Sequence, residues 1–318
     1  MEIMNSFEMK ISIIISTYSI DRYGDLIDLL ESIKIQTYKD IEIIIIIDKD
    51  RELYNKIETI ACDKYKNIKT VFNPKNRGLS YSRNVGIKCA AGDIITFIDD
   101  DAIPVPKWAE VIVNTFDSDD VGAVTGDIIP IWEHEDMSWF PKELHWMISC
   151  SYMMTPSSKC EIERGFGTNM SFRSNLIDKI GMFNTNLGLN GKKWVGGEDT
   201  EMFLRVRDSG KKVIFDPDAR VLHKIGVHRV GIRNIMKRAF DGGVSIVYMS
   251  NIRSYDVKKS TEKDYLKRLI FEFYPKTFKM LISKPSDSIR QMISVTIVIL
   301  SQGIGYLYGT FKWKSTVR

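Results

Sequence analysis

Six of the seven residues at positions 41–47 are isoleucine, in the run Ile-Glu-Ile-Ile-Ile-Ile-Ile. This run does not alternate between polar and apolar residues, so it favours a strand covered on both faces, as in a parallel sheet with helices on each side. Shorter apolar runs that predict further strands occupy residues 11–15, 68–72 and 94–98, with helical patterns around 26–35, 52–66 and 80–91. The alternation predicts βαβ units whose ligands bind at the carboxyl ends of the strands.

The regular alternation ends near residue 120. A strand is predicted at 121–129, and residues 132–159 form an irregular segment rich in aromatic residues and methionine, more typical of a lid or acceptor surface. Further elements are predicted at 167–173 (strand), 174–180 (helix) and 198–209 (helix). We therefore expect an α/β domain over residues 1–225, with a Rossmann-like, mostly parallel sheet flanked by helices, and a basic helical region over 226–318.

Charge is distributed unevenly along the chain. Residues 211–318 hold 21 Lys and Arg against 8 Asp and Glu, so the first 210 residues carry a net charge of −9 within a total of +4. Such a basic region faces anions, which could be phosphates, acidic lipids or nucleic acid. No nucleic-acid reader motif accompanies it, so nucleic acid is not expected as a partner. The four cysteines form no CxxC pair and the N-terminus resembles no secretion signal, which fits a reducing cytosolic setting.

Residues 291–311 contain no charged side chain and are flanked by Arg290 and Lys312. Their length suffices to span a bilayer, but serines, glutamines and glycines make them only moderately hydrophobic. A buried packing helix is one interpretation. Membrane contact, spanning or interfacial, is the other, and the basic flanks favour it. We expect this contact at the cytoplasmic face of the cell membrane.

Three consecutive aspartates, Asp99, Asp100 and Asp101, follow the strand at 94–98. Alternate side chains at a strand end point the same way, so Asp99 and Asp101 can converge on one ligand. A divalent metal that carries a nucleoside diphosphate would relieve the repulsion between these carboxylates. For an isolated triplet, a solvated turn that caps the next helix is the simpler interpretation.

Other strand ends carry polar residues too. Thr17 and Tyr18 follow the first strand and Asp48 closes the second. Tyr18 could stack on a base and Asp48 could accept from a base N–H, although each residue taken singly is more typical of a cap or a turn. The segment 76–87 (Asn-Arg-Gly-Leu-Ser-Tyr-Ser-Arg-Asn-Val-Gly-Ile) places Arg83 one turn into a helix, where it could bind a diphosphate. No glycine-rich phosphate loop is present in the sequence.

A second acidic site lies in the segment Trp194-Val195-Gly196-Gly197-Glu198-Asp199. Two carboxylates at the start of a helix can simply complement its dipole, or one of them can act as a general base beside a substrate hydroxyl. His223 follows a strand-like run at 219–222, where an imidazole can bind a metal or pack as a lone side chain.

Taken in order, these segments resemble the inverting nucleotide-sugar glycosyltransferases of family 2, which have the GT-A fold. The resemblance covers residues 10–225 and includes 167–173 (Gly-Thr-Asn-Met-Ser-Phe-Arg). It implies Asp199 as catalytic base, Asp101 and Asp99 as ligands of Mg²⁺ or Mn²⁺, and His223 as a further ligand. The implied nucleotide-sugar site comprises Thr17, Tyr18, Asp48, Arg83, Asp99, Asp100 and Asp101, and the implied acceptor site comprises Trp194, Gly197 and Glu198.

The implied reaction transfers a sugar from a nucleoside-diphosphate donor, with a UDP-sugar favoured, to a hydroxyl acceptor. The basic helices before an apolar segment suggest that this acceptor is a polyprenyl- or dolichyl-phosphate-linked sugar or another glycan. Two other functions compete with this interpretation: a sugar nucleotidyltransferase that releases pyrophosphate, and a non-catalytic glycan-binding protein.

Overall fold

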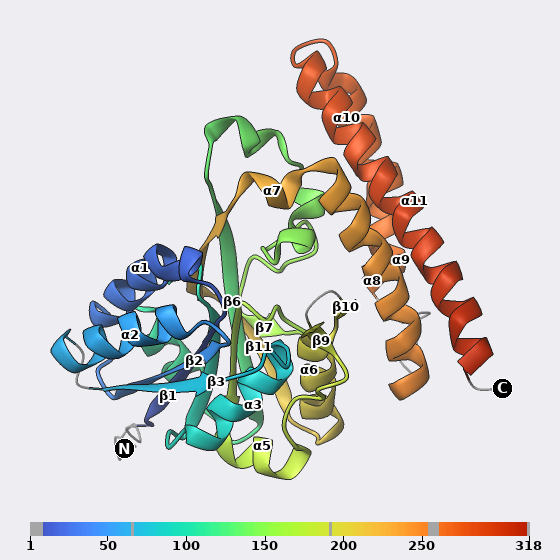
Figure 1. The fold of residues 1–318 in the computed structure, drawn as a ribbon. Coiled ribbons are helices and arrows are strands. Elements are labelled where there is room, and N and C mark those ends of the chain that lie inside the picture. The colour runs from blue at the N-terminus through green and yellow to red at the C-terminus, as the bar shows by residue number, and fades with distance from the viewer. Residues whose placement is uncertain (1–8, 65–66, 191–192, 254–260, 317–318) are drawn as a thin grey trace, which may run out of the picture. The chain divides into compact units, whose positions relative to one another are not determined.

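A central sheet in the N-terminal part confirms the α/β fold. The computed structural model describes residues 9–64, 67–190, 193–253 and 261–316, and within them nine strands form one sheet (Figure 1). Four of these strands are parallel, in the order β3-β2-β1-β4, so their carboxyl ends meet at one edge. Their bounds are Ile11–Thr17 (β1), Ile41–Asp48 (β2), Ile68–Asn73 (β3) and Ile94–Asp99 (β4).

The other half of the sheet is largely antiparallel. β8 pairs antiparallel with both β4 and β6, and β11 pairs antiparallel with β5 and with β7. The sheet is therefore mixed: it is parallel where strands alternate with crossover helices, and antiparallel pairing begins where that alternation ends. The bounds are Ala102–Pro104 (β5), Val121–Trp132 (β6), Cys160–Glu161 (β7), Asn169–Arg173 (β8) and Lys212–Ile225 (β11).

Helices cover both faces of the parallel strands, as the isoleucine-rich run predicts. On one face, Ile44 and Ile46 belong to a buried cluster with residues of α5 and α6, and α3 borders it. Ile45 and Ile47 are fully buried on the opposite face, and Figure 1 shows α1 and α2 together on one side of the sheet. The flanking helices are Tyr23–Lys34 (α1), Arg51–Lys64 (α2), Leu79–Cys89 (α3), Trp108–Thr115 (α4), Ser174–Ile180 (α5) and Glu198–Asp208 (α6).

The chain divides into two compact units. The sheet unit comprises residues 1–129, 156–193 and 198–223, and the helical unit comprises residues 130–155, 194–197 and 224–318. The expected domain boundary after residue 225 stays a prediction. The structure adds that most of the irregular aromatic segment, residues 130–155, groups with the C-terminal helices.

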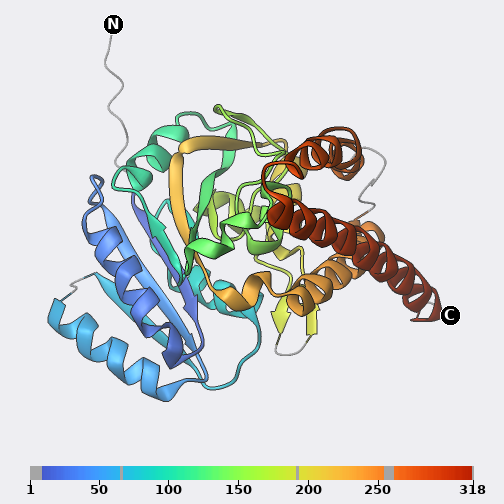
Figure 2. The ribbon, with the colours of Figure 1, turned by 90° about the horizontal axis from the view of Figure 1, so that it is seen from above.

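Helices dominate the second unit. Among them, α8 and α11 lie side by side in both ribbon views (Figures 1 and 2). α11 contains the predicted apolar segment, and its residues 285–312 are long and apolar enough to cross a membrane by length and composition. The bounds are Glu135–Trp139 (η2), Lys142–Ile148 (η3), Val227–Val230 (α7), Ile232–Arg253 (α8), Thr261–Arg268 (α9), Leu269–Phe273 (η4, a π-helical turn), Tyr274–Met280 (α10) and Pro285–Thr316 (α11).

Candidate active site

The parallel strands bring three predicted polar residues to one edge of the sheet. Thr17, Asp48 and Asp99 are the last residues of β1, β2 and β4. Ser16 lies opposite Asp99 in the register of the two strands. Thr17 is buried, whereas Tyr18, one residue further on, is exposed at the same edge. This is the position at which an α/β sheet receives a ligand, and the predicted contacts of these residues with a nucleotide stay predictions.

The acidic triplet meets His223 because two strands pair. β5 begins directly after Asp101, and its first residue, Ala102, lies opposite His223 of β11. Nε2 of the buried His223 is 3.0 Å from Oδ1 of Asp101. The ligand atoms of Asp99, Asp101 and His223 all lie within 4.8 Å of one another. The structure thus brings together the three residues that the resemblance implies as metal ligands.

This set of side chains fits a divalent cation. Carboxylate oxygens suit Mg²⁺ and Mn²⁺, and a neutral imidazole can complete the set. Asp100 lies between the two carboxylate ligands, and its Oδ2 is buried with no hydrogen-bond partner in the described part of the chain. Burial and the neighbouring charge of Asp101 raise the pKa of Asp100 to about 7. A buried cluster with this much negative charge is stabilised by positive charge.

Arg22 provides positive charge to the same cluster. Its Nη1 donates to Oδ2 of Asp101 at 2.6 Å and lies 3.8 Å from Oδ1 of Asp100. Burial alone would lower the pKa of Arg22, but the carboxylates of Asp100 and Asp101 raise it above its ordinary value. Arg22 ends the short turn η1 (Ile20–Arg22), which follows β1. It is not among the predicted residues, although a basic residue in the loop after the first strand is a signal that could have found it.

Asp48 is held by two neighbouring side chains. Nδ2 of Asn73 donates to its Oδ1 at 2.7 Å, and Oγ of Ser82 donates to its Oδ2 at 2.6 Å. Burial raises the pKa of Asp48, although both hydrogen bonds oppose the shift. The segment 76–87 therefore contributes Ser82 to the edge of the sheet in addition to Arg83.

Arg83 forms a buried ion pair with Glu198. Its Nη1 donates to Oε1 of Glu198 at 3.0 Å, and its Nη2 donates to the carbonyl oxygen of Gly167 at 3.2 Å. Nη2 also lies 3.8 Å from Oδ1 of Asp99. The Arg83 side chain is only 4% exposed. Arg83 thus lies beside the predicted metal ligand Asp99 and is also bonded to the first residue of α6.

Two consecutive residues link the predicted donor and base carboxylates. The amide N–H of Gly167 donates to Oδ2 of Asp199 at 3.0 Å, and Oγ1 of Thr168 donates to Oδ2 of Asp99 at 2.7 Å. Oδ1 of Asp199 also accepts from the N–H of Thr200. The two acidic sites, separate in the sequence, are therefore neighbours across one short segment.

Glu198 and Asp199 lie in different surroundings although they are adjacent. Glu198 is buried, and burial together with the charge of Asp199 raises its pKa to about 7, against the opposing effect of Arg83. Asp199 is partly exposed. The partly exposed Asp199 can reach a substrate hydroxyl, whereas the buried Glu198 cannot. Of the two carboxylates, Asp199 is therefore the one that suits a general base.

The remaining acceptor-site predictions fall just before α6. Gly197 has a φ of +100°, a conformation that favours glycine, and a Cβ at this position would lie 3.3 Å from Cγ of Met249 in α8. Trp194 lies in β10 (Lys193–Val195), which pairs with β9 (Gly188–Asn190). The side chain of Trp194 lies outside the described residues, so its predicted role stays untested.

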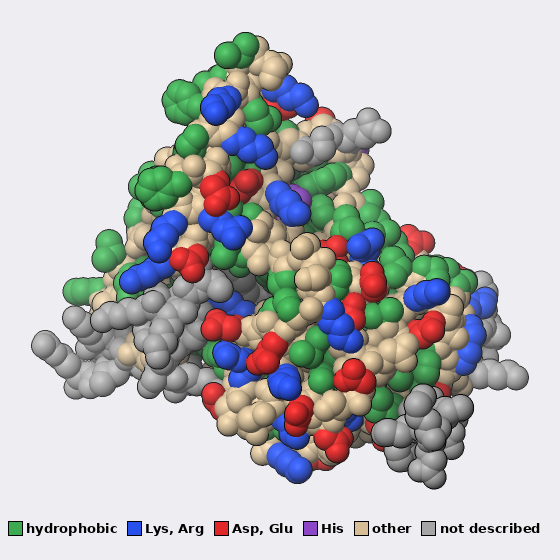
Figure 3. Space-filling view, turned by 180° about the vertical axis from the view of Figure 1, so that it is seen from behind, with side chains coloured by type: hydrophobic (Ala, Val, Ile, Leu, Met, Phe, Trp, Pro, Cys, Tyr) green, Lys and Arg blue, Asp and Glu red, His purple; other side chains and the backbone are tan. Residues whose placement is uncertain are grey.

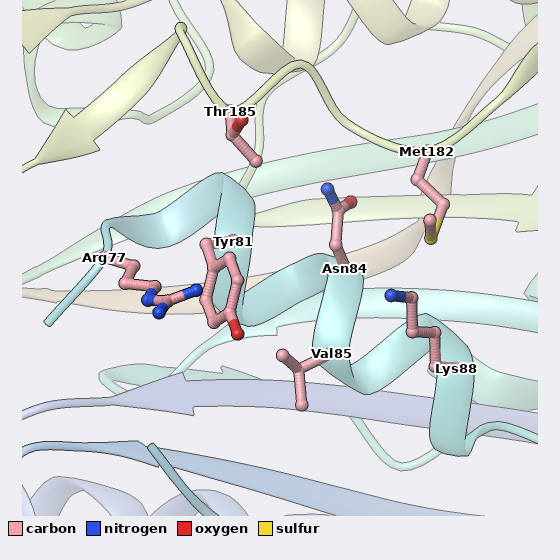
Figure 4. A pocket seen from close by; sticks show the side chains of 7 residues that line it. All are labelled: Arg77, Tyr81, Asn84, Val85, Lys88, Met182 and Thr185. Carbon is pink, nitrogen blue, oxygen red and sulfur yellow. The ribbon is translucent and has the colours of Figure 1, made fainter. Parts of the chain in front are cut away.

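A separate cavity of about 510 Å³ is lined by residues in or just before α3 and in the loop after α5. Figure 4 shows the side chains around it, which are Arg77, Tyr81, Asn84, Val85, Lys88, Met182 and Thr185. None of these is a carboxylate or a predicted site residue. The cavity is therefore no candidate for the metal site predicted at the sheet edge.

Comparison with known proteins points in the same direction as the geometry. A family model described as glycosyl transferase family 2 matches residues 12–181. A glucosyl-dolichyl phosphate glucuronosyltransferase of Haloferax volcanii is 31% identical over 307 residues, which cover 95% of this chain and 96% of the relative.

Two solved structures share the fold. The mannosyltransferase PcManGT of Pyrobaculum calidifontis, in complex with GDP-Man and Mn²⁺, has a TM-score of 0.62 and 15% identity, and the match covers 94% of this chain and 87% of that one. GalNAc-T7 with UDP, GalNAc and Mn²⁺ has a TM-score of 0.56 and 17% identity, with 82% and 54% covered.

The fold and the matches define a glycosyltransferase with the GT-A fold, an enzyme that transfers sugars. The chain belongs to glycosyl transferase family 2.

Proposed function

We propose that this enzyme transfers a sugar with inversion from a nucleoside-diphosphate donor, with a UDP-sugar favoured, to a hydroxyl of a polyprenyl- or dolichyl-phosphate-linked sugar. The observation that carries the proposal is the link between the two acidic sites, in which Thr168 bonds Asp99 and Gly167 bonds Asp199. A donor site and a base held this close suit a single displacement at one carbon. The resemblance of the full chain to a glucuronosyltransferase named for a dolichyl-phosphate sugar supports the acceptor class.

The donor would bind at the edge formed by β1, β2 and β4. Thr17, Tyr18 and Asp48 would contact the nucleoside, and Asp99, Asp100 and Asp101 the diphosphate and sugar. Asp99, Asp101 and His223 would hold Mg²⁺ or Mn²⁺, which supplies positive charge for the diphosphate leaving group. Arg22 donates a hydrogen bond to Asp101 and so orients its carboxylate, and Arg83, at 3.8 Å from Asp99, adds positive charge beside that carboxylate.

Asp199 would accept the proton of the acceptor hydroxyl as that oxygen attacks the anomeric carbon. Two backbone N–H groups, from Gly167 and Thr200, orient its carboxylate. General-base catalysis of this kind contributes about 10²–10⁴-fold to the rate. Glu198, paired with Arg83, fixes the start of α6, and Trp194, Gly197 and Glu198 would border the acceptor.

A membrane location would match a lipid-linked acceptor. We place the enzyme at the cytoplasmic face of the cell membrane, with α11 as the contact. The length and apolar composition of this helix support that contact.

The substitution Asp199→Asn tests the base. The variant keeps the size of the side chain but leaves only one oxygen to accept from the N–H groups of Gly167 and Thr200, so donor binding should persist while transfer falls by at least about 10²-fold. Wild type and variant are assayed with UDP-, GDP- and dTDP-sugars and Mg²⁺ or Mn²⁺, and the nucleoside diphosphate released is measured. Donor binding is titrated in a separate experiment. Near-normal turnover in the variant would refute the role of Asp199. Release of pyrophosphate in a parallel assay that supplies nucleoside triphosphates and sugar 1-phosphates would instead identify a sugar nucleotidyltransferase.

A further inference from the structure

The side chains of α11 are distributed in the reverse of the usual order for a helix of a soluble protein. Six of its large apolar residues are exposed, namely Ile289, Ile293, Leu300, Ile304, Leu307 and Phe311. We call these six residues the outward stripe. The opposite face is buried and consists mainly of small residues, namely Ser288, Ser294, Val295, Val298, Ser301, Gly305 and Gly309.

The spacing of the outward stripe keeps it on one side of the helix. Successive members are three, four or seven residues apart, which are the separations that place side chains on one face. The buried face has a close partner instead. A Cβ at Gly305 would overlap the carbonyl oxygen of Phe240 in α8, and one at Gly309 would lie 3.3 Å from Val247. The small residues of α11 therefore pack against α8, whereas the outward stripe stays exposed.

The elements before α11 extend this exposed apolar surface. Phe271 in η4, Phe278 in α10 and Ile282 after α10 are exposed, and Ile282 is 94% exposed. Figure 3 shows hydrophobic side chains along the outer edge of the C-terminal helices, with Lys and Arg side chains among them. Exposed apolar surface on this scale marks an interaction site.

Charge identifies the kind of partner. Residues 267–312 contain seven Lys and Arg, all exposed, and only two acidic residues. The basic residues are Lys267, Arg268, Lys276, Lys279, Lys284, Arg290 and Lys312. Basic side chains beside an apolar stripe complement an anionic lipid surface, where each contributes about 1 kcal/mol.

The pairing of α8 with α11 argues against a transmembrane span. Phe240 faces Gly305, and Val244 and Val247 face Gly309, so the two helices run in parallel. Lys237, one turn before Phe240, therefore lies level with the middle of segment 291–311. The Lys237 side chain is 61% exposed and pairs with Asp241 at 2.9 Å. A spanning α11 would carry these charges to the centre of the bilayer, which is unfavourable.

We propose that α10 and α11 form an in-plane anchor that lies on an anionic membrane, with the outward stripe among the acyl chains and the basic residues at the headgroups. This inference specifies how the membrane contact of the proposed function is made. It rests on the proposed function for the idea that the acceptor lies at the membrane. It does not depend on the transfer reaction, because lipid binding is measured without donor or acceptor.

Vesicle flotation tests the anchor. Purified full-length protein is added to preformed vesicles of phosphatidylcholine with phosphatidylglycerol, and to vesicles of phosphatidylcholine alone. We expect binding to the anionic vesicles that weakens with salt. The double substitution Leu300→Glu and Leu307→Glu should lower the partition coefficient by about 100-fold, since each buried leucine contributes about tenfold or more. As a matched control, Ile35→Glu replaces an exposed isoleucine of the sheet unit and should bind as the wild type does.

Three results would overturn the proposal. If the wild type does not float with anionic vesicles, or binds neutral ones equally, the anionic surface is not its partner. If the double variant binds like the wild type while its thermal unfolding is also unchanged, the stripe is not the contact. Alkaline carbonate should release the protein from cell membranes, and retention in the pellet would show a span instead. A failure of sugar transfer alone would leave all three readouts unaffected.

Discussion

Replacing Arg83 with methionine and Glu198 with glutamine, singly and together, tests whether their ion pair holds the start of α6 to the sheet unit. The methionine keeps the unbranched stem of the arginine, and the glutamine keeps the shape of the glutamate. Each single variant removes one charge; Arg83→Met also removes the hydrogen bond to the carbonyl oxygen of Gly167, a loss that cancels in the cycle. The double variant completes a cycle that isolates the coupling between the two side chains.

The structure sets the expected magnitude. Nη1 of Arg83 lies 3.0 Å from Oε1 of Glu198, and the two side chains are only 4% and 11% exposed. Removing one partner of a buried pair leaves the other charge without compensation and costs about 3–5 kcal/mol. Glu198 can take up a proton when Arg83 is lost, since its pKa is already about 7, so we expect the lower end, about 3 kcal/mol, for Arg83→Met. The coupling energy should be about 2–3 kcal/mol.

Urea unfolding at equilibrium measures the four free energies of unfolding. A second cycle provides the control: Nζ of Lys56 lies 3.2 Å from Oε1 of Glu52, but these side chains are 49% and 68% exposed. Lys56→Met and Glu52→Gln should therefore couple by only about 0.3–0.5 kcal/mol. A coupling for Arg83 and Glu198 no larger than that of the surface pair would refute the reasoning from burial.

Three further predictions concern pH, packing and the metal. The pKa of Glu198 lies at about 7, above its ordinary 4.5, so its contribution to stability is complete below pH 4.5 and is lost as the pH rises through 7. The unfolding free energy of the wild type relative to Glu198→Gln should fall by about 3 kcal/mol over that range in urea titrations. Gly305→Ala should destabilise the α8–α11 pair by about 1–3 kcal/mol in thermal unfolding, whereas Gly303→Ala, with nothing within 4 Å of the new Cβ, should stabilise α11 by about 0.5–1 kcal/mol. Asp101→Asn should weaken Mn²⁺ binding by about tenfold or more in an EPR titration of free Mn²⁺, and unchanged affinity would remove Asp101 from the ligand set.

Patterns local in the sequence predict the parallel half of the sheet well. The isoleucine run at 41–47 needs two covered faces, and β2 has them, with Ile44 and Ile45 buried on opposite sides. The same alternation of strands and helices predicts that the carboxyl ends of β1, β2 and β4 meet at one edge of the sheet, as they do. The structure brings the predicted metal ligands Asp99, Asp101 and His223 together, with their ligand atoms within 4.8 Å of one another.

Contacts between distant segments could not be predicted in this way. Arg22 reaches Asp101 only because the turn after β1 folds back over the strand edge. Thr168 and Gly167 join Asp99 to Asp199 because β8 pairs antiparallel with β4, and that reversal has no local signature. The outward stripe of α11 could not be predicted for a different reason. The mean hydropathy of a segment averages over all sides of the helix, so it does not show which side faces the neighbouring helix.

The contact between Gly197 and Met249 has a consequence for how substrate choice could change. The predicted acceptor residues Trp194 and Gly197 belong to the helical unit, in which Gly197 lies beside Met249 of α8, whereas Glu198 and every predicted donor residue belong to the sheet unit. A chimera that takes residues 130–155, 194–197 and 224–318 from a relative should therefore change the acceptor and keep the donor nucleotide. Such a result would mean that donor and acceptor preference can be inherited separately within one chain, as two exchangeable parts.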